Sequence, residues 1–131
     1  QIVEFIQAVG NPAVRLNYDT GNAWYYAKGG LDPAAELREV APVVAHVHLK
    51  APLVEDGVMR WVALGEGVLD LAAIGGILRH RLPAVPVSIE LSLRQRSRNF
   101  EPRWRTPEVP SLPEIRGIIR RSLKALEGAL A

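Results

Sequence analysis

Three side chains that can bind a divalent metal ion each stand at the end of a short apolar segment. They are Asp19, His48 and Glu90, and the segments before them are typical of buried strands. In barrels of parallel strands, active sites are built at the C-terminal strand ends. Two carboxylates and one imidazole form an oxygen-rich ligand set, which suits Mn²⁺, Mg²⁺ or Co²⁺, with Zn²⁺ as a further candidate. The sequence therefore predicts a site for a divalent metal ion.

Other polar side chains lie within the same segments or just after them. Asn22 lies one turn past Asp19, where its amide could meet a substrate hydroxyl. His46 precedes His48 by two residues and shares its face of the strand. We expect it to contact substrate or to hydrogen-bond a ligand residue, and a buried core histidine is the alternative. Lys50 follows His48 by two residues, and its side chain should point toward the same predicted site, where it could contact an anionic group.

Two further candidates for substrate contact lie in the stretch between the second and third segments. Glu66 stands between two glycines, and either its carboxylate or only the glycines matter there. Trp61 could stack on a sugar ring, as could Trp24, or both could pack beneath loops. A cluster of arginines suggests either a solvated loop or an anion site for a phosphorylated substrate: Arg94, Arg96, Arg98, Arg103 and Arg105.

Helical and strand-like segments alternate along the chain. The spacing predicts a helical tail at 2–6, strands over 14–18, 43–49 and 86–91, loops at 51–67 and after the third strand, and helices opened by Asp32-Pro33, Asp70 and the capping box of Ser111 and Glu114. The stretch after Asp19 is expected to be a loop. Such alternation favours a parallel sheet with right-handed crossovers.

The composition is that of one globular domain over residues 1–131, with 48% hydrophobic and 23% charged residues. No apolar run reaches the length of a membrane span. The net charge of +2 is small for a nucleic-acid-binding surface, so a nucleic-acid partner is not expected. The chain has no cysteine, which excludes disulfides, thiolate metal sites and a cysteine nucleophile. We expect a cytoplasmic protein.

Three parallel strands leave two open sheet edges, which promotes association. A closed eight-stranded barrel needs about 250 residues. We therefore expect the sheet to be completed by further N-terminal sequence, by a second chain or by a swapped dimer, and we favour the first.

Four motifs in order carry a family resemblance: Asp19-Thr20-Gly21-Asn22, His46-Val47-His48-Leu49-Lys50, Leu64-Gly65-Glu66-Gly67 and Ser88-Ile89-Glu90. Together they resemble the C-terminal part of the xylose-isomerase-like TIM-barrel superfamily, which includes sugar phosphate isomerases and epimerases. The resemblance implies an α/β fold made of the last three strands of a (β/α)₈ barrel. It also implies that Asp19, His48 and Glu90 are metal ligands. The family's fourth ligand is a glutamate on an earlier strand and has no counterpart here.

The activity implied by this resemblance is a metal-dependent isomerisation or epimerisation of a small sugar or sugar phosphate. Glu90 would be catalytic, acting as base and then as acid in proton transfer through an enediolate. A metal-assisted hydride shift remains open. Many members of the family have an aspartate after the His-Leu-Lys run, where this chain has Ala51, so Lys50 is a weaker candidate than the ligands.

Two other classes remain as alternatives. An apurinic-endonuclease-type DNA repair nuclease would need more histidines than the three present and a histidine near Asn22. A non-catalytic accessory protein, built from part of a barrel, would explain the small number of strands. The presence of all three ligand residues argues against it.

Overall fold

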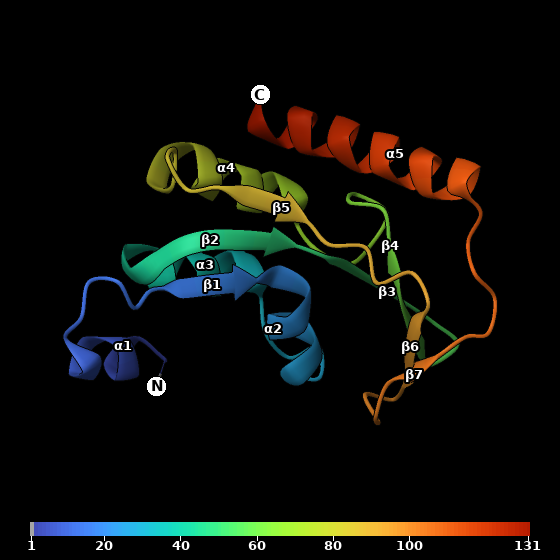
Figure 1. The fold of residues 1–131 in the computed structure, drawn as a ribbon, viewed down its shortest axis with the longest axis horizontal. Coiled ribbons are helices and arrows are strands. Elements are labelled where there is room, and N and C mark those ends of the chain that lie inside the picture. The colour runs from blue at the N-terminus through green and yellow to red at the C-terminus, as the bar shows by residue number, and fades with distance from the viewer. Residues whose placement is uncertain (1) are drawn as a thin grey trace.

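The computed structural model describes residues 2–131, which form a parallel sheet, an antiparallel sheet and five α-helices (Figure 1). The helices are α1 (Ile2–Val9), α2 (Thr20–Tyr26), α3 (Pro33–Val40), α4 (Leu71–Arg81) and α5 (Leu112–Leu130), with a 3-10 turn at Ala41–Val43. The strands are β1 (Leu16–Asp19), β2 (Val44–Leu49), β3 (Ala51–Glu55), β4 (Val58–Val62), β5 (Val87–Ile89), β6 (Gln95–Arg98) and β7 (Trp104–Arg105).

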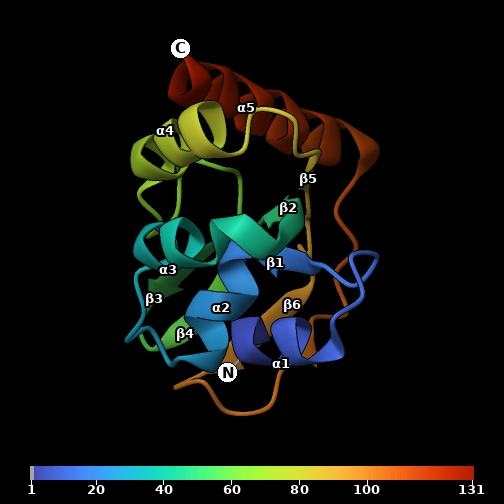
Figure 2. The ribbon, with the colours of Figure 1, turned by 90° about the vertical axis from the view of Figure 1, so that its left-hand side faces the viewer.

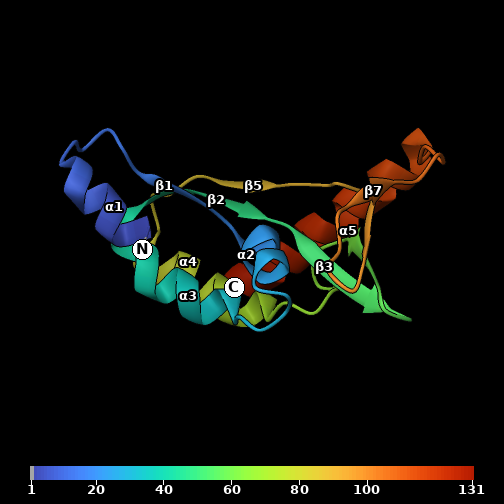
Figure 3. The same cartoon turned by 90° about the horizontal axis from the view of Figure 1, so that it is seen from below.

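The parallel sheet has the strand order β1-β2-β5 and confirms the predicted alternation of helices and parallel strands. Helices α3 and α4 lie on one face of it, and no helix of the described residues covers the other face (Figures 2 and 3). The core lies between the sheet and these helices, where Leu37, Val47 and Ile74 are fully buried. The fold is thus mixed α/β, and its three-stranded parallel sheet is open and does not close into a barrel.

Three helices begin as their sequences predict. The side chain of Asp32 caps α3, and that of Asp70 caps α4 by accepting the N–H of Ala73 at 2.9 Å. Ser111 and Glu114 form both hydrogen bonds of the capping box at the start of α5. Helix α5 packs along α4 so closely that a methyl group on Gly75 would collide with the backbone of Ala129 in α5.

The predicted loop after Asp19 is wrong, because residues 20–26 form helix α2. Asp19 is its N-cap and accepts the backbone N–H of Asn22 at 2.7 Å. The helix has only seven residues, too few for a clear apolar period. It places Asn22 directly beside the end of β1.

The predicted loops at 51–67 and after β5 are also wrong, because both contain strands. Strands β3 and β4 form a hairpin, and β6 and β7 extend it to the antiparallel order β3-β4-β6-β7. The turn residues Asp56 and Gly57 have positive φ values of 50° and 71°. An Asp-Gly pair is a strong signal for such a two-residue turn. This sheet stands beyond the C-terminal ends of the parallel strands (Figure 1).

Helices long and apolar enough to cross a membrane do not occur within residues 2–131.

Candidate metal centre

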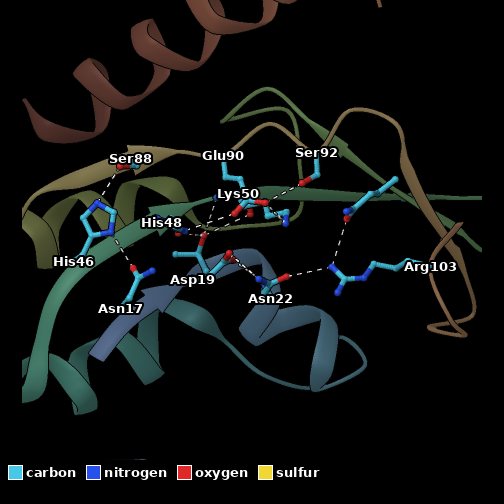
Figure 4. Close-up of polar contacts among 12 residues, drawn as sticks. Asn17, Asp19, Asn22, His46, His48, Lys50, Ser88, Glu90, Ser92 and Arg103 are labelled. Atoms are coloured by element: carbon cyan, nitrogen blue, oxygen red, sulfur yellow. Dashed lines mark hydrogen bonds and ion pairs between the residues drawn. The ribbon is translucent and has the colours of Figure 1, made fainter. Parts of the chain in front are cut away.

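Three potential metal ligands meet at the C-terminal edge of the parallel sheet (Figure 4). Asp19 is the last residue of β1 and pairs in register with His48 of β2, while Glu90 directly follows β5. The backbone N–H of Glu90 donates to the carbonyl of Leu49 at 2.9 Å, which continues the pairing of β2 with β5 by one residue. One ligand atom from each of the three side chains lies within 4.8 Å of the others.

The Asp19 carboxylate is oriented by Asn22. One oxygen, Oδ1, accepts the Asn22 backbone N–H at 2.7 Å, and Oδ2 accepts the Asn22 side-chain amide at 2.8 Å. Burial raises the pKa of Asp19 above its usual range, although the Asn22 N–H and the charge of Lys50 act in the opposite direction. A cation placed between the ligands would lower this pKa and offset the cost of burying the carboxylate.

The Glu90 carboxylate has the opposite electrostatic environment. Burial by itself would raise the pKa of Glu90, but hydrogen bonds from Lys50 and Ser92 lower it below its usual range. Both donors bind the same oxygen, Oε1, at 2.5 Å from Lys50 Nζ and 2.8 Å from Ser92 Oγ. The other oxygen, Oε2, lies 3.6 Å from Nδ1 of His48. Glu90 is therefore ionised at neutral pH and keeps one oxygen outside this hydrogen-bond pair.

The chemistry of these donors fits a divalent cation. Two carboxylates and an imidazole converge from three strands, and all three side chains are half-buried, so a cation could reach them. Hydrogen bonds from neighbouring residues orient both carboxylates: Asn22 donates to Asp19, and Lys50 and Ser92 donate to Glu90. Orientation of ligands by neighbouring hydrogen bonds is a usual feature of metal sites in proteins.

Three further polar side chains, Asn17, His46 and Ser88, each lie two residues before one of the potential ligands and on the same face of the sheet. His46 bridges the other two, with Nδ1 2.9 Å from Asn17 Oδ1 and Nε2 2.9 Å from Ser88 Oγ. The His46 ring also meets the His48 ring edge to face, with centroids 4.7 Å apart. His46 thus contacts the ring of His48, but both of its ring nitrogens pair with Asn17 and Ser88, which are not among the three potential ligands. A role of His46 in substrate binding stays a prediction.

Lys50 and Trp61 connect the centre to the antiparallel sheet. Lys50 is 2% exposed, and its ammonium lies between Glu90 and the ring of Trp61, whose centroid is 4.4 Å away. Trp61 is 3% exposed and packs with Tyr25 and Met59. This placement favours the packing role of Trp61 over stacking on a sugar, because Lys50 covers the ring. The anionic group that Lys50 contacts is a carboxylate of the protein itself.

Glu66 is directed toward helix α5. Its carboxylate accepts a hydrogen bond from Nε of Arg121 at 2.6 Å, in an exposed ion pair. No contact within the described residues joins Glu66 to Asp19, His48 or Glu90. A substrate contact by Glu66 stays a prediction, without support from this arrangement.

Four residues around the centre were not singled out from the sequence. Asn17 and Ser88 precede their ligands by two residues and Ser92 follows Glu90 by two, so strand alternation could have found Asn17 and Ser88. Arg103 was noted only as one of several arginines. Its approach to Asn22, with Nη1 3.5 Å from Oδ1, depends on a pairing 81 residues apart in the sequence.

A mixed α/β fold with an open parallel sheet, and with a potential metal centre at the C-terminal strand ends, defines the class of protein. The model of one protein family, the xylose isomerase-like TIM barrel, matches residues 1–120. The chain belongs to this family, which confirms the predicted resemblance. A search of curated proteins found no match.

Proposed function

We propose that this chain carries most of the metal site and one proton-transfer group of a sugar or sugar-phosphate isomerase or epimerase. One observation carries the proposal: ligand atoms of Asp19, His48 and Glu90 lie within 4.8 Å of one another at the active-site end of the strands. Membership of the xylose isomerase-like family supports the reaction class. Mn²⁺, Mg²⁺ and Co²⁺ are the ions best matched to these donors.

Different residues would bind the metal ion and orient its ligands. Asp19, His48 and Glu90 would hold the ion, which when bound polarises a sugar carbonyl and stabilises the negative charge that develops on its oxygen. Asn22 and Ser92 keep the two carboxylates oriented.

Glu90 is the proposed base and then acid. Its lowered pKa keeps it ionised at neutral pH, as a base must be before it accepts a proton. Lys50 and Ser92 orient the Glu90 carboxylate through Oε1, and this carboxylate is the group we assign to accept the substrate proton. Return of the proton by Glu90 to the neighbouring carbon would give isomerisation, whereas epimerisation would need a second acid, outside this chain's proposed set, to protonate the opposite face.

Calorimetric titration of Mn²⁺ tests the metal site. The wild-type chain should bind one ion, and His48→Ala should weaken binding by at least about 10- to 100-fold, the loss already typical when a supporting partner is removed. His80→Ala is the matched control, because His80 is exposed at the end of α4 and, among the described residues, hydrogen-bonds only with Arg79. Equal affinity in the wild type and His48→Ala, or no binding by either, would contradict the site.

Solvent exchange tests the reaction class. A panel of ketoses and ketose phosphates in D₂O should gain deuterium next to the carbonyl with the Mn²⁺-loaded chain. Glu90→Gln should abolish exchange because the amide cannot accept the proton. Exchange that persists in Glu90→Gln would contradict the role of this residue.

A further inference from the structure

Arg103 is held in place by neighbouring side chains, and within residues 2–131 it has no carboxylate partner. It precedes β7, and its Nη2 donates to the hydroxyl of Tyr26 at 2.9 Å. The centre of its guanidinium lies 5.0 Å from the ring centroid of Tyr25 and 5.6 Å from that of Tyr26. Two aromatic side chains of helix α2 thus hold the guanidinium in a defined position.

The remaining contacts of this guanidinium are long and neutral. Nη1 lies 3.5 Å from both Asn22 Oδ1 and Gln95 Oε1, at the outer limit of a hydrogen bond. The ion pairs formed within residues 2–131 use other cations, namely His48, Lys50, Arg60 and Arg121. A bound anion would be a much stronger acceptor than either amide, because charge-assisted hydrogen bonds are shorter and roughly twice as strong.

The position of Arg103 relates it directly to the metal centre. Asn22, which faces Arg103 through Oδ1, donates its amide N–H to the ligand Asp19 (Figure 4). Two neighbouring arginines are used differently: Arg94 donates to the carbonyl of Thr106, and Arg96 to the carbonyls of Leu93 and Gln95. Those two brace the backbone, whereas Arg103 is directed at the site.

We propose that Arg103 binds an anionic group of the substrate, a phosphate or a carboxylate, while the metal centre holds the reacting end. The inference rests on the proposed function and narrows it, because it makes the substrate an acidic sugar derivative and not a neutral sugar. The planar guanidinium can offer two parallel N–H groups to either anion, which an ammonium group cannot do. Asn22 would then connect the metal centre with the anion site, since its side chain contacts both Asp19 and Arg103.

Nitrogen-15 NMR of the arginine side chains tests the anion site in the metal-free chain. The Arg103 Nε–H signal, assigned by its absence in Arg103→Gln, is followed during separate titrations with inorganic phosphate, D-gluconate and neutral xylitol. We expect a saturable shift with at least one anion and none with xylitol. A response to phosphate alone indicates a phosphate ester as substrate, and a response to gluconate alone indicates a sugar acid.

Variants give the affinity comparison by calorimetry with the responding anion. Arg103→Gln should weaken binding at least about 10-fold, and Arg103→Lys should recover part of it by keeping the charge. Arg98→Gln is the matched control, since Arg98 is an exposed arginine on the neighbouring strand β6, and it should bind as the wild type does. Unchanged affinity in Arg103→Gln, no saturable shift with either anion, or an equal shift with xylitol would overturn the proposal.

The anion test is independent of the metal test. Intact Mn²⁺ binding with no anion binding would overturn the role of Arg103 and leave the proposed function standing. Anion binding that depends on Arg103, in a chain that binds no Mn²⁺, would sustain the anion site and contradict the metal-dependent function.

Discussion

The parallel and antiparallel sheets contribute different chemistry to the same end of the molecule. The parallel sheet supplies the three potential metal ligands from adjacent strands in register. The antiparallel sheet supplies the packing support of Trp61 from β4, and Arg103 lies in the segment just before its last strand, β7. A ligand set demands positions fixed to fractions of an ångström, which regular strands provide, whereas substrate contacts can be carried by more variable segments.

The two sheets meet at Gly21 and Lys50. Gly21, in helix α2, lies against the backbone of Lys50 and the ring of Trp61. Lys50 follows β2 and reaches across from Trp61 to Glu90, one of the three potential ligands. If the parallel sheet alone forms the metal site, a substitution at this junction should weaken metal binding much more than a substitution at the outer turn of the antiparallel sheet.

The largest effect is expected for Gly21→Ala. A methyl group there would lie 2.5 Å from the carbonyl oxygen of Lys50 and 2.7 Å from Cζ3 of Trp61, so the helix or the strand end must move. Overpacking of this kind costs about 1–3 kcal/mol, and the backbone contact places this change at the upper end. Urea denaturation should show this loss, and Mn²⁺ affinity should fall with it because α2 begins directly after Asp19, a potential ligand.

Gly76→Ala provides the matched control for that substitution. Gly76 lies in helix α4 with nothing within 4 Å of an added methyl group. Alanine there should stabilise the chain by about 0.5–1 kcal/mol through better helix propensity. A Gly21→Ala variant as stable as the wild type would show that the two sheets are not packed as described.

The convergence of Asp19, His48 and Glu90 could be predicted from the sequence because it follows from local rules. Each of these residues ends an apolar segment, and adjacent parallel strands bring such ends together. His46 was predicted on the face of His48 for the same reason, and the rings are in contact. The same alternation, applied two residues before Asp19 and Glu90, would have identified Asn17 and Ser88.

The surroundings of the site could not be predicted to the same degree, because they depend on distant contacts. Glu66 pairs with Arg121, and Arg103 approaches Asn22, across separations of 55 and 81 residues. Nothing near either residue in the sequence indicates its partner. The β3–β4 hairpin differs from these, since its Asp56-Gly57 turn is a local signal that the apolar pattern did not reveal.

A moderate effect is expected for Gly57→Ala at the outer turn of the antiparallel sheet. Gly57 has a φ of 71°, a conformation that costs an alanine about 1–2 kcal/mol. Urea denaturation should show a loss of about 1 kcal/mol, with Mn²⁺ affinity unchanged within about twofold. Gly57→Asn is the control, because asparagine tolerates this conformation better, and it should lose less. A tenfold loss of Mn²⁺ affinity in Gly57→Ala would mean that the hairpin positions the ligands.

The smallest effect on stability at neutral pH is expected for Lys50→Met, at the junction itself. Methionine can keep the contact with the Trp61 ring, and Glu90 is exposed enough to be solvated, so the loss at pH 7 should be below about 1 kcal/mol. The pKa of Glu90 should rise toward its ordinary value, because the ammonium donor to Oε1 is gone. NMR titration of the labelled Glu90 carboxyl carbon measures that change.

The pH dependence of stability then separates an electrostatic role of Lys50 from a packing role. A carboxylate whose pKa is lowered by folding adds stability above its unfolded pKa, and that stability is lost as the pH falls through the folded pKa. Wild-type stability should therefore fall more between pH 7 and pH 3 than that of Lys50→Met. Lys124→Met, which removes an exposed lysine of α5, should behave as the wild type does. Identical pH dependence in Lys50→Met and the wild type would mean that Lys50 joins the two sheets by packing alone, without lowering the pKa of Glu90.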